Sequence, residues 1–266
     1  MRGLTLCVLL SLVWPAIAVE RVITLAPSLT EIVLELGAGD LLVGVLDGGE
    51  RPAAAQHVPS VGRLGQLELE SLLQLQPDLV LLWPDSISRS QREQLQRFGI
   101  DVLVVEPRKL GDLAEQFVDI GQRIGRAEQG RALQQQFLAG LLALRKQYGR
   151  ETPLRVFYQV WDAPLYTLGG QQIISDALHV CGARNVFAEL SLPAPQVSIE
   201  AVLQANPEVI LASSQAQLDA WRIWPGLAAV EREQLWVVPD SGLERPSFQM
   251  LGALAKLCER LSEAHP

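Results

Sequence analysis

The chain has 266 residues, of which 48% are hydrophobic and 20% are charged, and its formal net charge is −8. This length and composition are typical of a globular protein with room for two lobes. The acidic residues are spread along the chain rather than gathered in a tail, so the charge argues against a nucleic-acid partner.

Residues 1–18 have the pattern of an export signal. Arg2 precedes an apolar run over 4–14, and an Ala-Ile-Ala cleavage site ends at Ala18. The alternative is a membrane anchor, but the run is short for a bilayer span. We therefore expect cleavage after Ala18 and a mature chain in an extracytoplasmic compartment.

Export leaves two cysteines in the mature chain, Cys181 and Cys258. Two cysteines in an oxidising compartment predict one disulfide, which would close a loop of 77 residues (258 minus 181). Such a loop is worth about 4 kcal/mol in the chain-entropy model. The alternative is a pair of buried thiols.

Short apolar strands alternate with helices through the first half of the chain. Residues 21–25 predict a strand, and Ser28 and Glu31 have the spacing of a capping box at the start of a helix that Gly37 ends. Further strands are expected at 41–45, 79–83 and 101–105, and further helices at 70–76 and 88–99. Strands that are apolar on both faces indicate a parallel sheet covered by helices on both sides.

The alternation stops between residues 111 and 148, where the pattern is helical throughout. Residues 126–149 contain no proline, and Leu133, Phe137 and Leu141 recur at helical spacing. A helix of this length extends about 36 Å at 1.5 Å per residue. It would therefore span a whole lobe rather than turn a corner.

After this helix the α/β pattern resumes. Strands are expected at 155–160, 209–213 and 235–239, and helices at 171–180, 198–205 and 246–261. We predict an N-terminal lobe at 19–123, a linker helix at 124–150 and a C-terminal lobe at 151–266. Ligands of such sheets bind at the carboxyl ends of the strands, so two facing lobes would form a cleft.

The two predicted lobes also contain a repeated sequence segment. ESLLQLQPDLVLL at 70–82 matches EAVLQANPEVILA at 200–212, and each reads as a helix, a proline stop and a strand. The repeat predicts equivalent helices in the two lobes, with Glu70 and Glu200 at equivalent positions.

Several short segments, taken in order, resemble a known family. They are RVITLAPSLTE at 21–31, V-G-V at 43–45, QPDLVLLW at 76–83, RVFYQV at 155–160, C-G-x-x-N-V-F at 181–187, P-Q-V-S at 195–198 and E-R at 244–245. The chain resembles the helix-linked class III of periplasmic substrate-binding proteins, which serve ABC importers of iron complexes and cobalamin. Within that class it is most similar to the cobalamin-binding members.

The resemblance implies a periplasmic binding protein that is monomeric, holds its ligand between the lobes and delivers it to a dimeric permease. In this family a glutamate on each lobe docks on permease arginines, and Glu70 and Glu200 lie at the matching positions. The alternative for both is simple helix-dipole stabilisation. No cofactor or metal is implied apart from the transported ligand. Because one helix offers few hinge positions, the lobes are expected to move little.

The resemblance and the strand ends together predict the cleft residues. We expect Gly48, Trp83, Trp161, Tyr166, Asp240, Leu243, Glu244 and Arg245 at the ligand. Trp83 has the alternative of packing in the core, and Glu244 and Arg245 that of an exposed loop pair. Trp221, Trp224 and Trp236 are expected to pack the second lobe.

Three positions depart from the cobalamin-binding pattern, because Gly48, Leu64 and Ala194 stand where those relatives have aromatic residues. The departures leave haem and ferric siderophores open as alternative ligands. His57, His179 and His265 are too scattered for a metal-ion site, although His57 remains a candidate axial ligand. Two other classes also remain: an enzyme, for which no catalytic motif is present, and a periplasmic sensor module.

Overall fold

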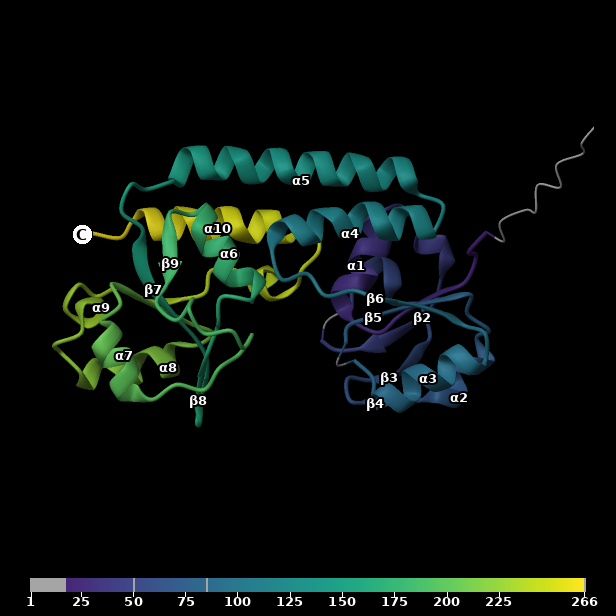
Figure 1. The fold of residues 1–266 in the computed structure, drawn as a ribbon, viewed down its shortest axis with the longest axis horizontal. Coiled ribbons are helices and arrows are strands. Elements are labelled where there is room, and N and C mark those ends of the chain that lie inside the picture. Colours follow the sequence, from purple (N-terminus) through teal and green to yellow (C-terminus); the bar gives the residue numbers. More distant parts are fainter. Residues whose placement is uncertain (1–17, 50, 85, 266) are drawn as a thin grey trace, which may run out of the picture.

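Two β-sheets, one from each half of the chain, form the framework of the molecule. The computed structural model describes residues 18–49, 51–84 and 86–265, so nearly all of the predicted export signal lies outside the described residues. Helix α5 (Ala127–Tyr148) runs across both halves (Figure 1). The predicted α/β fold of two lobes with a long connecting helix is confirmed.

The first sheet has the strand order β4-β3-β2-β1-β5-β6, and β3 with β4 is its antiparallel pair. The strands are β1 (Val22–Thr24), β2 (Leu42–Asp47), β3 (Ser60–Arg63), β4 (Gln66–Leu67), β5 (Leu79–Leu82) and β6 (Asp101–Val104). The helices are α1 (Pro27–Glu35), α2 (Leu69–Gln74), α3 (Arg89–Arg97) and α4 (Leu110–Arg123). All four residues of β5 are buried, as expected for a strand that is covered on both faces.

The second sheet has the order β11-β10-β7-β8, with β9 paired to the first part of β7. The strands are β7 (Leu154–Asp162), β8 (Leu165–Thr167), β9 (Ala183–Asn185), β10 (Val209–Ala212) and β11 (Leu235–Val237). The helices are α6 (Ile173–Val180), α7 (Ile199–Ala205), α8 (Gln215–Asp219), α9 (Ala228–Glu231) and α10 (Met250–Ser262). Short 3₁₀ turns are η1 (Gly39–Leu41), η2 (Ala53–Ala55), η3 (Ala220–Ile223) and η4 (Ser241–Glu244).

The start of α1 differs from the predicted capping box. The helix begins at Pro27 with Ala26 as its N-cap, and no side chain caps it. Proline is favoured in the first helical turn, so the helix starts early and places both Ser28 and Glu31 inside it. The predicted capping box is therefore wrong. A capping box is present at the start of α3, where the Ser88 hydroxyl accepts from the Gln91 N–H at 3.2 Å.

The lobes share a hydrophobic core as well as the linker helix. Helices α4 and α10 lie one after the other alongside α5, at one edge of the molecule (Figure 1). Phe117 of α4 meets Phe137 of α5 at a ring-centroid distance of 5.5 Å. Phe248, which precedes α10, lies 6.2 Å from both rings. One buried cluster thus connects the two lobes, which the sequence pattern alone did not predict.

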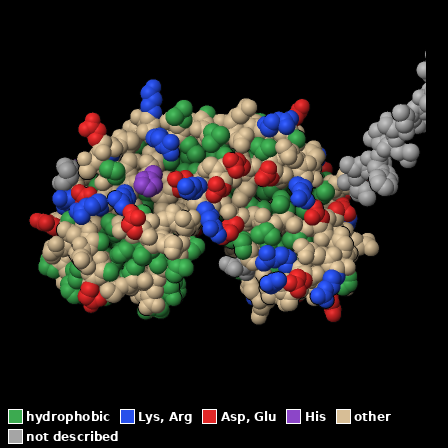
Figure 2. Space-filling model, viewed as in Figure 1, with side chains coloured by type: hydrophobic (Ala, Val, Ile, Leu, Met, Phe, Trp, Pro, Cys, Tyr) green, Lys and Arg blue, Asp and Glu red, His purple; other side chains and the backbone are tan. Residues whose placement is uncertain are grey.

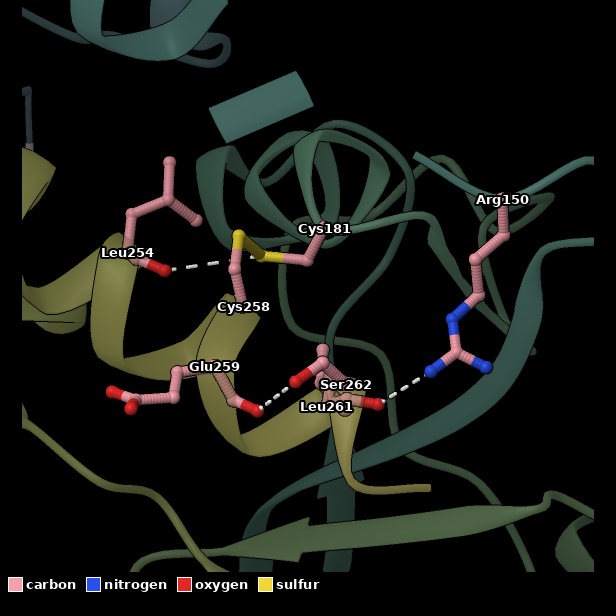
Figure 3. The surroundings of a disulfide bond; sticks show 7 residues. All are labelled: Arg150, Cys181, Leu254, Cys258, Glu259, Leu261 and Ser262. Atoms are coloured by element: carbon pink, nitrogen blue, oxygen red, sulfur yellow. Dashed lines mark hydrogen bonds between the residues drawn. A yellow bond between two sulfur atoms is a disulfide. The ribbon is translucent and has the colours of Figure 1, made fainter. Parts of the chain in front are cut away.

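The predicted disulfide is present in the second lobe (Figure 3). Cys181 directly follows α6 and Cys258 lies in α10, with the sulfur atoms 2.01 Å apart. Beside it, the Arg150 guanidinium donates to the carbonyl of Leu261 at 2.7 Å. The closing helix is therefore tied both to α6 and to the residues that follow α5.

The sequence repeat corresponds to two equivalent helix–strand units, α2–β5 and α7–β10. The equivalence extends to the backbone, because Gln76 (φ 44°) and Asn206 (φ 43°) are both left-handed and both precede a proline. In Figure 1, α2 and α7 both lie on the side of the molecule opposite α5. Within the described residues, no helix combines the length and apolarity that a bilayer crossing needs.

Candidate functional site

A cavity of about 560 Å³ lies between the two lobes. The space-filling view shows the molecule hollowed between the lobes, on the side away from α5 (Figure 2). From the first lobe the lining includes Leu64, Trp83, Pro84, Glu106, Pro107 and Arg108. From the second lobe it includes Tyr158, Val160, Gln171, Gln172, Pro193, Leu243 and Glu244. The volume is typical of a small-molecule site.

Strand ends position most of this lining. Trp83 and Pro84 directly follow β5, and residues 106–108 follow β6 by two positions. On the other side, Leu243, Glu244 and Pro246 come after β11, in or just after η4. The site therefore lies at the carboxyl ends of parallel strands, where α/β sheets bind ligands.

A hydrogen bond joins two cavity residues of the second lobe. The Tyr158 hydroxyl donates to Oε1 of Glu244 at 3.3 Å. Burial of the phenol raises the pKa of Tyr158, and the negative charge of Glu244 raises this pKa further. Tyr158 therefore remains a neutral donor at physiological pH, and Glu244 keeps acceptor capacity for a ligand.

The first lobe contributes an ion pair to the cavity wall. The Arg108 guanidinium lies 3.2 Å from Glu106, and about half of each side chain is exposed. Both residues are directed to the cavity by the end of β6. Solvent weakens such a pair, so both groups remain able to contact a ligand.

The predicted cleft residues divide into two groups. Trp83, Leu243 and Glu244 line the cavity. Asp240 does not, because its side chain caps η4 by accepting from the Gly242 N–H at 2.8 Å and pairs with Lys256 at 2.6 Å. The hydrogen bond from Lys256 and that from Gly242 lower the pKa of Asp240.

Trp161 and Tyr166 lie outside the cavity lining, on the β7–β8 hairpin. They are cross-strand partners, and the Trp161 indole donates to the Ala163 carbonyl at 3.3 Å. Trp161 is 58% exposed beside Val160, which does line the cavity. The hairpin thus presents an aromatic pair next to the cleft rather than in its wall.

The departures from the cobalamin-binding pattern have different consequences. Leu64 lines the cavity and is 65% exposed, so it offers an apolar surface where the resemblance predicts an aromatic ring. Gly48 lies outside the lining, and a Cβ built on it would be 3.1 Å from Cγ of Pro27. A larger residue at position 48 would therefore require Pro27 to shift.

Glu244 and Arg245 face different partners. Glu244 accepts from Tyr158, whereas Arg245 forms an ion pair with Glu31 of the first lobe. Arg245 lines a second cavity, of about 390 Å³, together with Glu31, Glu35 and Arg51. The expectation that Glu244 and Arg245 both contact the ligand is thus supported by the cavity only for Glu244.

Glu70 and Glu200 occupy the second position of α2 and of α7. Both are exposed. A hydrogen bond from its own backbone N–H, with a second from Ser198, lowers the pKa of Glu200. The structure therefore gives the two lobes equivalent exposed carboxylates, which suits a partner with two equivalent basic sites.

Glu106, Arg108 and Tyr158 line the cavity but were not predicted from the sequence. The strand-end rule that indicated Trp83 applies equally to Glu106 and Arg108, which follow the predicted strand 101–105. Tyr158 lies in the middle of the predicted strand 155–160, where alternation alone does not say which face meets the other lobe. Its strand, β7, runs on to Asp162, so a residue in mid-strand reaches the cleft.

The remaining tryptophans pack in the second lobe, and His57, His179 and His265 are exposed. Trp221 and Trp236 are buried in the second lobe, and the Trp221 indole donates to Gln159 at 2.7 Å. In the part of the chain that the structure describes, no group of three or more His, Cys, Asp or Glu side chains is arranged to hold a metal ion.

Comparison with known proteins gives a consistent result. A family model described as periplasmic binding protein matches residues 22–240. The vitamin B12-binding protein of Vibrio parahaemolyticus is 34% identical over 244 residues, covering 91% of this chain and 89% of that protein. The chain belongs to the periplasmic binding protein family, and the resemblance found in the sequence is confirmed.

Solved structures agree with this assignment. The crystal structure of the periplasmic vitamin B12-binding protein BtuF of Vibrio cholerae matches with a TM-score of 0.82 at 33% identity, covering 92% of this chain and 98% of that one. The periplasmic haem-binding protein HutB of Vibrio cholerae matches with a TM-score of 0.80 at 20% identity, covering 91% and 98%. This second likeness is one of fold alone. These relatives are binding proteins, which places this chain among periplasmic binders rather than enzymes.

Proposed function

We propose that this chain captures cobalamin or a related corrinoid in the cleft between its lobes and delivers it to the permease of an ABC importer. The observation that carries the proposal is the cavity itself, which is built from both lobes at strand ends. The named relatives that share about a third of its residues over nine-tenths of its length bind vitamin B12, which supports the same ligand class here.

The chemistry of the cavity fits a large amphipathic ring. Trp83, Leu64, Val160 and Leu243 provide apolar surface from both lobes. A flat ligand gains affinity from such walls, and each aromatic contact adds about 0.5–1.5 kcal/mol beyond its buried area. Polar groups at the rim then fix the orientation of the ligand.

The charges of the cavity favour a corrinoid over haem. Among the described residues that line it, the charged ones are Glu106, Arg108 and Glu244. One cation is therefore outnumbered by two carboxylates, and Arg108 is already paired with Glu106. Haem carries two carboxylates, which this set would repel, whereas the amide side chains of a corrin can donate hydrogen bonds to both glutamates.

Calorimetric titration of the mature protein, from Val19 onward, tests this ligand assignment. We expect one-to-one binding of cyanocobalamin at micromolar affinity or tighter, and weak or no binding of haem under the same conditions. Binding of haem with no heat from cyanocobalamin would keep the family assignment and overturn the ligand.

The docking role of Glu70 and Glu200 is part of the same proposal. Changing either to lysine places a positive charge where permease arginines are expected, so ligand uptake by the reconstituted importer should fall at least tenfold. Affinity for cyanocobalamin should not change, because neither residue lines the cavity. Glu93→Lys on the exposed face of α3 is the control for charge reversal. Equal losses in all three variants would contradict docking through this pair.

A further inference from the structure

In each lobe, a carboxylate contacts a cleft-lining segment of the other lobe. Glu31 of α1, in the first lobe, pairs with Arg245 of the second. Asp176 of α6, in the second lobe, accepts a hydrogen bond from the Leu110 N–H of the first at 2.9 Å. Both contacts cross between the lobes, and both reach segments that also line the cavity.

Glu31 is the more deeply buried of the two carboxylates. Its side chain is 7% exposed, and besides Arg245 it accepts from the Ser247 hydroxyl at 2.8 Å and from the Gln249 amide. All three partners come from one short stretch, 245–249. The residues just before and within that stretch, Leu243, Glu244 and Pro246, line the cavity. Glu31 therefore fixes a cleft wall of the second lobe to the first lobe.

Asp176 makes the corresponding contact in the opposite direction, from the second lobe to the first. It lies in the first turn of α6, next to Ile173 and Ile174 of the cavity lining. Its partner Leu110 is buried and begins α4. The residues just before Leu110 include Glu106 and Arg108, so Asp176 holds a cleft wall of the first lobe to the second lobe.

The two contacts are topologically equivalent. Helices α1 and α6 are the first helices of their lobes. The segments that they hold follow β6 and β11, the last strands of each sheet, and lead into α4 and α10. The arrangement is therefore reciprocal, with the first helix of each lobe bound to the exit of the last strand of the other.

A buried ion pair contributes little net stability, because desolvation offsets its attraction, but it penalises alternative geometries strongly. The Glu31–Arg245 ion pair and the Asp176–Leu110 hydrogen bond lie on opposing segments and together would restrict the angle between the lobes. A site that is already formed binds without paying for reorganisation, whereas a site formed in a tenth of the molecules binds about tenfold more weakly.

We propose that Glu31 and Asp176 are positioning residues that preset the width of the cleft through these two reciprocal contacts. The expected change in cyanocobalamin affinity rests on the proposed binding function. The expected control of the angle between the lobes does not. Neither carboxylate lines the cavity, so both act through the segments they hold.

Spin labels on the two lobes test the proposal directly. Gln96→Cys on α3 and Ala216→Cys on α8 place labels at exposed sites of opposite lobes, and the native cysteines are already paired. In the ligand-free mature protein, Glu31→Ala and Asp176→Ala each remove the acceptor of a contact between the lobes, and each should broaden the distribution of label distances. Saturating cyanocobalamin should narrow it again, and the double variant should bind cyanocobalamin at least tenfold more weakly.

Matched controls remove carboxylates that hold backbone within a single lobe. Glu208→Ala removes the acceptor of the Arg155 N–H in the second lobe, and Asp78→Ala removes that of the Arg21 N–H in the first lobe. These variants should keep the wild-type distance distribution and affinity. The proposal would be overturned by unchanged label-distance distributions in both the Glu31 and the Asp176 variant. Equal broadening in these variants and in the control variants would overturn it as well.

The readouts separate this proposal from the ligand assignment. If cyanocobalamin does not bind the wild type, the ligand assignment fails, while the ligand-free distances still decide the role of the two carboxylates. If Glu31→Ala does not fold, Asp176→Ala carries the same comparison, because Asp176 is only half-buried.

Discussion

At the scale of single residues, the two copies of the repeat place different side chains at the same left-handed backbone position. Asn206 adopts its left-handed φ of 43° at low cost, because asparagine tolerates this region, and its side chain accepts from the Ala228 N–H at 2.9 Å. Gln76 has the same φ but is a residue type that rarely adopts it. The first lobe thus carries a small local strain that the second lobe avoids.

Replacing Gln76 with asparagine should therefore stabilise the protein. Strain of this kind costs about 1–3 kcal/mol, of which asparagine should recover a part, so we expect a gain of about 0.5–1 kcal/mol in the free energy of unfolding. Urea denaturation monitored by circular dichroism measures it. Gln74→Asn, in the last helical position of α2, is the control and should be neutral or slightly destabilising. A stability loss from Gln76→Asn would contradict this account.

Single site residues could be predicted where a strand ends at the cleft. They could not be predicted where the other lobe determines whether a residue lines the cavity. Trp83 was predicted because it ends the predicted strand 79–83, at the edge where α/β sheets bind ligands. Tyr158 was not, because its position in the wall depends on how β7 faces the first lobe. Arg245 was expected at the ligand, yet its pairing with Glu31 depends on a contact 214 residues away (245 minus 31) that no local pattern encodes.

At the scale of elements, α1 is unusual in burying carboxylates against the opposite lobe. Glu35 accepts from the backbone N–H groups of Phe248 at 2.9 Å and Gln249 at 3.2 Å. Burial raises the pKa of Glu35 in spite of these hydrogen bonds, and the nearby charge of Glu31 adds to the effect. The carboxylates of α1 thus lose solvation but gain contacts with the second lobe.

The raised pKa of Glu35 gives a signed pH dependence. Between its ordinary value of 4.5 and its raised value, the folded state binds more protons than the unfolded state, so stability from this group is lost as pH rises through that window. Glu35→Gln removes the titration. Its stability relative to wild type should therefore increase from pH 4 to pH 7 in urea denaturation series.

Glu259→Gln, at an exposed site of α10, controls for the loss of one negative charge. Stability curves of Glu35→Gln and wild type that stay parallel across this pH range would show that burial does not disfavour the charged form of Glu35.

Long elements could be predicted from sequence, whereas several very short strands could not. The linker helix was expected at 126–149 and spans Ala127–Tyr148, because a proline-free amphipathic run of this length has few alternatives. Strands β4, β8 and β9 have only two or three residues, too few to show alternation. They form because neighbouring strands present unpaired edges, which is a tertiary effect.

At the scale of the whole molecule, the lobes are connected by more than the linker helix. The Phe117, Phe137 and Phe248 cluster joins three segments of the shared core, and polar contacts cross between the lobes at Glu31 and Asp176. The expectation of small lobe movements, drawn from a single connecting helix, has further physical support from these contacts. The binding site is consequently a property of the assembled pair of lobes rather than of either alone.

The central claim is that a corrinoid binds in the cleft between these lobes, and Trp83 offers the most direct test. Titration of the mature protein with cyanocobalamin, followed by intrinsic tryptophan fluorescence, should give saturable one-to-one quenching. Trp83→Ala should weaken the affinity at least tenfold, whereas Trp224→Ala, outside the cavity lining, should leave it unchanged. Absence of saturable binding in the wild type, or equal affinities in all three proteins, would contradict the account.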